Sequence, residues 1–345
     1  MSLRRPVPTF YVLAALVSSS AITAWWLKDR AIETDETTAA QVSSVPKDPC
    51  AMRINRVSGF GHIRPIVFAR TACEAQRLAP LKGRLQALIS EERATGALTR
   101  ASIFLNDLTD GSWISVNGTE HFEPGSLMKV ATMLAVLMKA ELEPGFATKR
   151  FTFNSSIHFP HQQYPPSSDL LIGQEYTLGE LLRYSIALSS NKAEAVLLQE
   201  VGGPAYQSML SMMGLPSVDP GEVHYPIAAP DYARFFEALY GASLLGTANS
   251  ELGLEMLGHS EFTIGLRAGV PKGIDVASKF GETAFDGSRQ LHEAALVFAD
   301  HRPYLVVVMT QGRTAEELAG FLREVSAMAY QQLTAPEYSV LAIAY

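Results

Sequence analysis

The sequence predicts an α/β fold of the α+β type, in which an antiparallel sheet is flanked by N- and C-terminal helices and joined to an inserted all-helical lobe. Three observations lead to this prediction. Strand-like patterns occur near both ends of the folded region, helical spacing of apolar residues fills the middle, and an amphipathic helix lies outside each group of strands. Because strands from both ends can pair in one sheet, we expect a single two-lobed unit with a cleft between the lobes.

Local patterns support each element in order. Leucines at helical spacing predict a helix over 78–93, and the Asp110-Gly111 turn joins predicted strands at 101–108 and 113–116. Gly125 then opens an apolar helix from Ser126 to about Leu142. The other helices predicted for the middle are 177–189, 192–201, 204–213, 229–240 and 250–257. The last predicted elements are strands at 275–281, 291–299 and 304–310 and a closing helix at 314–331.

Composition excludes several classes of protein. The 345 residues are 47% hydrophobic and 18% charged, which is ordinary globular usage and does not fit a disordered, collagen-like or coiled-coil chain. The formal net charge is −7 and the chain has no basic block. Because nucleic-acid-binding domains carry clustered Lys and Arg to neutralise phosphates, no nucleic-acid partner is expected.

The N-terminus predicts entry into a membrane. Pro6–Leu27 run for 22 residues without a charge, which at 1.5 Å per residue is enough to span about 30 Å of hydrocarbon. Ser19 and Ala21 place small residues before a possible cleavage site, so a signal anchor and a cleaved signal peptide both stay open. If the segment is uncleaved, the chain contacts the membrane through residues 7–27. An exported protein is therefore expected, periplasmic or otherwise extracytoplasmic, with anchoring in the inner membrane as one alternative.

These signals divide the chain into five parts. Residues 28–49 are polar, contain two prolines and lack periodicity, which predicts a disordered tether. The predicted parts are 1–27 (signal anchor or signal peptide), 28–49 (tether), 50–77 (a segment bracketed by cysteines), 78–333 (the two-lobed domain) and 334–345 (C-terminal tail).

The two cysteines, Cys50 and Cys73, are too few for a disulfide scaffold. Outside the cytoplasm, a pair with no other partner is expected to form one disulfide bond. Two unpaired buried thiols are the alternative. Metal binding is disfavoured because neither cysteine has a CxxC mate or a nearby histidine at ligand spacing.

A nucleophile is predicted by one of three S-x-x-K strings, Ser44–Lys47, Ser126–Lys129 and Ser189–Lys192. Pro46 lies inside the first string, and the third has no apolar helix joining its serine to its lysine. Ser126 alone opens a long apolar helix, with Lys129 one turn later on the same face. A neighbouring lysine can take the proton of a serine hydroxyl if burial or a second cation lowers its pKa.

Two further motifs follow in order. Ser189-x-Asn191 lies in a break between predicted helices, where helix capping is the simpler explanation of these residues. Lys279-x-Gly281 lies in a predicted strand, where a glycine lets a ligand approach the backbone closely and a lysine can hold a carboxylate. K-x-G occurs in this sequence only once.

The ordered set Phe122-x-Pro124-x-Ser126-x-x-Lys129, Ser189-x-Asn191 and Lys279-x-Gly281 resembles the penicillin-recognising serine hydrolases, which include class A β-lactamases, D-alanyl-D-alanine peptidases and transpeptidases. The resemblance runs from about Leu81 to Leu333 and implies a β-lactamase/transpeptidase-like fold. It implies the following roles: Ser126 as the acylated nucleophile, Lys129 as the base, Ser189 as the proton shuttle, Asn191 and Lys279 as ligands of the substrate amide and carboxylate, and the backbone N–H groups of Ser126 and Glu282 as the oxyanion hole.

Two departures from the family pattern stand out. Phe280 occupies the middle of the third motif, where relatives have Thr or Ser, and we expect its ring beside the cleft. In class A β-lactamases a loop glutamate activates the deacylating water, but here Gly214–Pro230 is short and lacks the E-x-x-L-N pattern. Glu222 is the only glutamate of this loop and the first candidate for this base, but its simpler explanation is a solvated loop residue. His224 and Asp219 are weaker candidates for the same role. His292 is expected to be a hydrogen-bonded structural histidine.

The sequence therefore predicts a serine hydrolase that forms an acyl-enzyme on Ser126 with a β-lactam or a peptidoglycan stem peptide and deacylates slowly. The alternatives are a non-catalytic peptidoglycan-binding module of the cell envelope and a glutaminase-like amidase of the same fold. No metal or organic cofactor is expected, and the protein is expected to be a monomer.

Overall fold

A computed structural model describes residues 50–56, 63, 65–154, 159, 161–220, 222, 224–285, 288–299 and 302–335. They belong to one compact unit, Pro49–Tyr345. The predicted membrane-entry segment, the tether and all but the first two residues of the C-terminal tail lie outside the described residues. Within the described ranges, no helix is long and apolar enough to cross a membrane.

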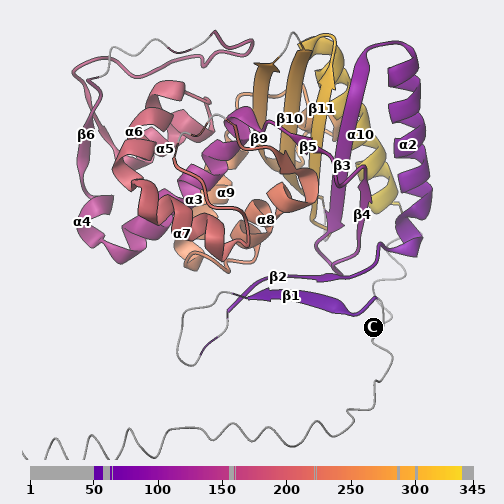
Figure 1. Cartoon of the computed structure of the whole chain (residues 1–345), viewed down its shortest axis with the longest axis horizontal. Coiled ribbons are helices and arrows are strands. Elements are labelled where there is room, and N and C mark those ends of the chain that lie inside the picture. The colour runs from indigo at the N-terminus through magenta and orange to yellow at the C-terminus, as the bar shows by residue number, and fades with distance from the viewer. Residues whose placement is uncertain are drawn as a thin grey trace, which may run out of the picture. The chain divides into compact units, whose positions relative to one another are not determined.

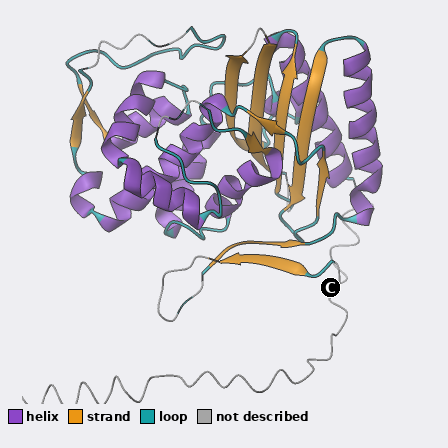
Figure 2. Ribbon diagram, viewed as in Figure 1, coloured by secondary structure: helices purple, strands orange, loops and turns teal. Residues whose placement is uncertain are grey.

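The centre of the fold is a five-stranded antiparallel sheet with the strand order β4-β3-β11-β10-β9 (Figures 1 and 2). Its strands are β3 (Leu98–Asp107), β4 (Trp113–Val116), β9 (Asp275–Phe285), β10 (Ser288–Phe298) and β11 (Tyr304–Gly312). The β3–β11 pairing joins the N-terminal strands to the C-terminal ones, with Phe104 opposite Val307. The run of Val306, Val307 and Val308 is apolar on both strand faces because both faces of the sheet are covered.

Two long helices cover one face of this sheet (Figure 1). They are α2 (Ala79–Ala94) and α10 (Ala315–Leu333), close to the predicted bounds. Leu81 and Leu85 of α2 and Leu322 and Val325 of α10 share a core with the sheet residues on this side. The Thr314 side chain caps α10 by accepting from the Glu317 backbone N–H, so a local signal fixes where this helix begins.

A lobe of helices covers the other face and is built around α3. The helices of the lobe are α3 (Lys129–Leu142), α4 (Pro144–Ala147), α5 (Leu178–Ile186), α6 (Asn191–Val201), α7 (Gly203–Met212), α8 (Ala229–Tyr240) and α9 (Thr247–Gly258). Every residue from Lys129 to Leu137 is buried, so α3 is the central helix of the lobe. Such a helix is apolar on all sides, which explains why its sequence lacks a polar stripe.

The prediction that the middle of the chain is entirely helical was wrong in detail. Two short antiparallel pairs interrupt it, β5 (His121–Phe122) with β8 (Ile227–Ala228) and β6 (Arg150–Thr152) with β7 (Glu175–Thr177). Strands of two or three residues are too short to show the alternation that identifies a strand in sequence.

The segment between the cysteines forms a hairpin that packs on the two-lobed unit. Cys50 and Cys73 are joined by a disulfide bond, and they enclose β1 (Met52–Arg56) and β2 (Ile66–Thr71). The Arg70 guanidinium of β2 forms a 2.6 Å ion pair with Glu237 of α8 and lies over the ring of Phe104. The hairpin is therefore held by contacts to a helix of the lobe and to the sheet.

Candidate active site

Ser126 lies in a single 3₁₀ turn, η2 (Gly125–Met128), that leads directly into α3. An α-helix beginning at Ser126 was expected; instead the α-helix begins at Lys129. Gly125 has a φ of 52°, and a Cβ there would lie 2.5 Å from the Glu282 carbonyl oxygen. Only glycine fits this position, because the conformation is left-handed and the neighbouring strand is in contact.

Strand β9 packs against the turn that carries Ser126. A Cβ on Gly281 would lie 2.3 Å from the Pro124 carbonyl oxygen and 2.7 Å from the Leu127 nitrogen. The strand glycine of the third motif therefore lets two backbone segments touch. This contact brings the main chains of Ser126 and Glu282, the two residues whose N–H groups the resemblance assigns to an oxyanion hole, to one wall of the cleft.

Lys129 is buried, and its ammonium group is oriented by the second motif. Nζ donates to Ser189 O at 2.6 Å, to Asn191 Oδ1 at 2.9 Å and to Ser189 Oγ at 3.3 Å. Burial lowers the pKa of Lys129 to about 8, and the carboxylates of Glu194, Asp169 and Glu282 oppose that shift. About one molecule in ten then carries a neutral lysine at pH 7, which is the form that can accept a proton.

Ser189 lies between two buried lysines. Its φ of 58° is left-handed, a conformation that a non-glycine residue keeps only when its surroundings hold it. Lys279 Nζ donates to Ser189 Oγ at 2.9 Å and to Phe280 O at 3.0 Å. Burial, and then the positive charge of Lys129, hold the pKa of Lys279 well below its ordinary value. Ser126 of the first motif and Lys279 of the third are 153 residues apart in the sequence. The three motifs nevertheless meet at one hydroxyl, Ser189 Oγ, to which Lys129 and Lys279 both donate.

Helix capping at the second motif is carried out by Ser190. The Ser190 hydroxyl accepts from the Ala193 backbone N–H at 3.1 Å and donates to Asp169. Ser189 and Asn191 are therefore free of the capping role that offered the simpler explanation of the motif.

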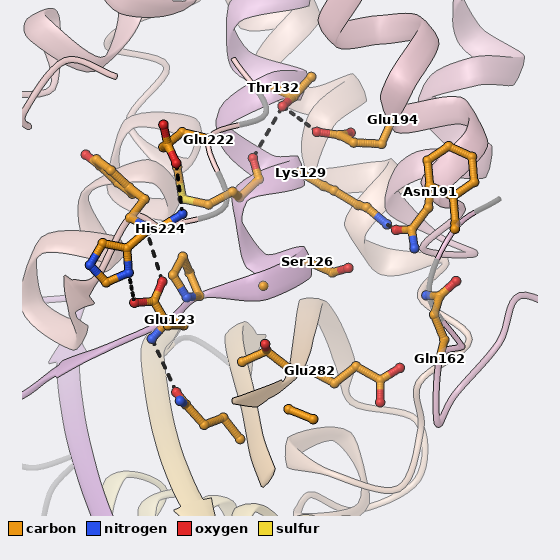
Figure 3. Close-up of a pocket in the computed structure, with 18 of the residues that line it drawn as sticks. Glu123, Ser126, Lys129, Thr132, Gln162, Asn191, Glu194, Glu222, His224 and Glu282 are labelled. Carbon is orange, nitrogen blue, oxygen red and sulfur yellow. Dashed lines mark hydrogen bonds and ion pairs between the residues drawn. The ribbon is translucent and has the colours of Figure 1, made fainter. Parts of the chain in front are cut away.

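Part of this set lines a cleft of about 870 Å³, while Ser189 and Lys279 are fully buried behind its wall (Figure 3). Ser126, Lys129 and Asn191 lie on its wall, with the Lys129 ammonium group directed towards Asn191. In the part of the chain that the structure describes, no group of three or more His, Cys, Asp and Glu side chains is arranged to hold a metal ion.

Comparison with known proteins identifies the family. A family model described as "Beta-lactamase enzyme family" matches residues 80–333. The chain belongs to the beta-lactamase enzyme family. Two of its curated relatives are the beta-lactamase of Bacillus subtilis, 25% identical over 63% of this chain and 73% of that protein, and beta-lactamase CTX-M-25 of Escherichia coli, 24% identical over 79% and 97%.

Solved structures share the fold. PBP-A superposes with a TM-score of 0.63 at 19% identity, over 75% of this chain and 97% of that one. An ancestral class A beta-lactamase gives 0.61 at 23% identity, over 72% and 99%. A point mutant of PBP-A has been captured as an acyl-enzyme with penicillin G; its TM-score is 0.62 at 20% identity, over 74% and 96%. The family match supports a serine hydrolase of the beta-lactamase kind.

The loop between α7 and α8 carries the residues considered above as a base for the deacylating water. Glu222 lines the cleft and is exposed, and its Oε1 accepts from the His224 backbone N–H at 3.3 Å. His224 Nδ1 lies 2.7 Å from Glu123 Oε1, and Glu123 Oε2 accepts from the Tyr225 backbone N–H. Asp219 accepts from the Gln207 side chain. In this arrangement His224 and Glu123 hold the loop against the turn that precedes Ser126.

Sequence reasoning missed two carboxylates of the site, Glu123 and Glu194. Glu194 Oε1 accepts from Thr132 Oγ1 at 2.6 Å and Oε2 accepts from Ser185 Oγ at 2.8 Å, which ties α6 to α3 and α5. Their positions in the sequence could have identified both residues. Glu123 lies within the first motif, and Glu194 lies three residues after Asn191, in the first turn of α6.

The expectation that the Phe280 ring lies beside the cleft was wrong. The ring is buried and stacks on Phe262 with centroids 4.4 Å apart, and Tyr164 meets it edge-on. Successive side chains of a strand point to opposite faces, so a Lys279 that reaches Ser189 turns Phe280 into the layer beneath α10.

His292 has the geometry of a structural histidine. The Thr310 backbone N–H donates to Nδ1 at 3.0 Å, so the proton of the neutral ring is on Nε2, which donates to Glu123 O at 3.0 Å. Burial lowers the pKa of His292 to about 4. The ring therefore stays neutral at pH 7 while it braces the main chain at Glu123, three residues before Ser126.

This shift predicts a loss of stability in acid. Because the pKa of His292 is below the unfolded value of about 6.5, the unfolded chain binds more protons between the two values, and stability falls as pH decreases. Between pH 7 and 5, His292 is expected to cost about 2 kcal/mol of unfolding free energy. Urea unfolding of wild type and His292→Asn at both pH values measures this contribution, and equal pH dependence of the two proteins would contradict it.

Proposed function

We propose that this protein forms an acyl-enzyme on Ser126 with β-lactams or with D-alanyl peptides of the cell wall, and that the acyl-enzyme hydrolyses slowly. The observation that carries the proposal is that Lys129 and Lys279 both donate to Ser189 Oγ, and that Lys129 lines the same cleft as Ser126. A paired serine and buried lysine have no evident use in a protein that only binds.

The proposed acylation uses these groups in turn. Neutral Lys129 accepts the Ser126 hydroxyl proton as Oγ attacks the carbonyl carbon of the substrate. The N–H groups of Ser126 and Glu282 receive the developing oxyanion. The C–N bond then breaks, and the leaving nitrogen takes its proton from Ser189 Oγ, which receives in turn the proton that Lys129 took from Ser126, since Lys129 Nζ donates to Ser189 Oγ.

Hydrolysis of the ester requires a base for water. Glu222 is exposed, and the neighbouring loop residues are committed to holding the loop. This supports an acyl-enzyme that accumulates.

Intact-mass spectrometry of the purified protein with a penicillin tests the proposal. The expected result is an adduct of one whole β-lactam, because ring opening loses no atoms, that persists after excess drug is removed. Ser126→Ala should show no adduct. An adduct that survives this substitution would remove Ser126 from its role, and rapid nitrocefin turnover by wild type would contradict slow deacylation.

The proposed site of action is outside the cytoplasm. The uncharged run Pro6–Leu27 supports export, and the disulfide between Cys50 and Cys73 suits an oxidising compartment. Fractionation of cells expressing the full chain, with N-terminal sequencing of the product, tests export and cleavage together.

A further inference from the structure

The third motif lacks part of the usual means of holding a carboxylate on the substrate. The Phe280 ring is buried against Phe262 and Tyr164, so the middle of the motif presents no hydroxyl to the cleft. Lys279 is fully buried, and its ammonium group donates to Ser189 Oγ and to Phe280 O. Its Nζ also lies 4.4 Å from the centre of the Phe280 ring.

The next residue places a carboxylate on the same wall. Glu282 lines the cleft and is half-buried, and its carboxylate points towards the segment that carries Gln162 (Figure 3). Two consecutive backbone N–H groups hold it, Gln163 to Oε2 at 3.1 Å and Tyr164 to Oε1 at 3.2 Å. These two donors fix the position of the Glu282 carboxyl group on this wall of the cleft.

The same short segment reaches Ser189. Gln162 Nε2 donates to Ser189 O at 3.3 Å, while its neighbour Gln163 donates to Glu282. Ser189 serves the leaving nitrogen in the proposed reaction, so the Glu282 carboxylate lies on the leaving-group side of the cleft. Burial lowers the pKa of Lys129 and of Lys279. The negative charge of Glu282 opposes both shifts, so it acts on both lysines.

Carboxylates also outnumber Lys and Arg side chains over the cleft as a whole, so its charge has the same negative sign as Glu282. Among the described residues that line it, the carboxylates are Glu123, Glu194, Asp219, Glu222 and Glu282, and the Lys and Arg side chains are Lys129 and Arg289. Arg289 lies opposite Ala284 in the β9–β10 register, beyond Glu282, and donates to Gln163 Oε1.

We propose that Glu282 slows acylation by substrates whose leaving group carries a carboxylate next to the scissile C–N bond, as in penicillins and D-alanyl-D-alanine termini, relative to substrates that lack this carboxylate. This inference rests on the proposed function. A carboxylate at that position would face the Glu282 carboxylate at short range, where like charges repel and screening is weak. The favoured substrates are then neutral or cationic on this side: amide bonds within a peptide rather than at its free C-terminus, and β-lactams with an esterified carboxyl group.

The test compares a penicillin with its methyl ester, with Ser126 acylation followed by intact mass at low ionic strength. Wild type is expected to react with the ester about tenfold faster than with the free acid. Raising salt from about 0.05 M to about 0.5 M should speed the acid reaction and leave the ester reaction unchanged, because salt screens charge repulsion. These two measurements need no variant.

Glu282→Gln assigns the effect to one side chain. The ester-to-acid rate ratio is expected to fall about tenfold, through a faster acid reaction, and the ratio is independent of how much of the variant is active. Glu316→Gln is the matched control, since Glu316 also contacts Gln163 but does not line the cleft, and its ratio should equal that of wild type. A wild type that prefers the free acid, or an unchanged ratio in Glu282→Gln, overturns the inference alone. Acylation by neither compound overturns the proposed function.

Discussion

Lys129→Ala is expected to slow acylation of Ser126 by about 1,000-fold, within the range that loss of a general base produces. The substitution removes the group that accepts the Ser126 proton and also the three hydrogen bonds that Nζ donates to Ser189 and Asn191. The measurement is the rate of adduct formation with a penicillin, with thermal unfolding recorded to show that the variant is folded.

Lys192→Ala is the matched control for this prediction. Lys192 belongs to the competing string Ser189–Lys192, but its ammonium group bonds Leu170 O and pairs with Asp169. Its loss is expected to leave the acylation rate within about threefold of wild type. Equal losses in the two variants would show that the assignment of the base is wrong.

The pH dependence of acylation has a definite sign. The base must be neutral, and the pKa of Lys129 is lowered by burial to about 8. The acylation rate should therefore rise about tenfold per pH unit below 8 and level off above it.

Gly281→Ala is expected to reduce acylation about 100-fold, the loss that accompanies displacement of a reacting group by about 1 Å. The added Cβ would lie 2.3 Å from the Pro124 carbonyl oxygen, so β9 must move away from the turn that carries Ser126. This movement separates the two N–H groups proposed to bind the oxyanion.

Gly269→Ala separates this effect from a general loss of stability. A Cβ on Gly269 would be equally close, 2.3 Å from the Arg323 carbonyl oxygen, but the contact is between η3 (Leu266–Gly269) and α10. This variant should lose stability while each folded molecule acylates at the wild-type rate. If Gly281→Ala does the same, the contact between β9 and the turn has no part in the reaction.

Much of the architecture could be predicted because it is encoded over short stretches. The apolar spacing that predicts α2 and α10, and the valines that predict β11, are properties of windows of ten to twenty residues. The order of the three motifs also belongs to the sequence, and together with the strands at both ends it indicated the family and the two lobes.

The arrangement of groups within the site depended on contacts that no local pattern records. The ammonium group of Lys129 is directed by residues 60 and 62 positions away, and Glu194 meets Thr132 across two helices. Phe280 shows the limit most clearly, since only the register of β9 against η2 and β10 decides which face of the strand Lys279 takes and which Phe280 takes.

The amino-acid sequence alone shows that a candidate serine nucleophile, two lysines and a strand glycine occur in a fixed order on predictable elements. The burial of both lysines against one serine hydroxyl, the ion pair between the loop histidine and Glu123, and the place of Glu282 on the cleft wall emerge from the folded structure alone. The physical reason is that burial and charge proximity, which set these pKa values and the selectivity inferred from them, arise between segments far apart in the chain.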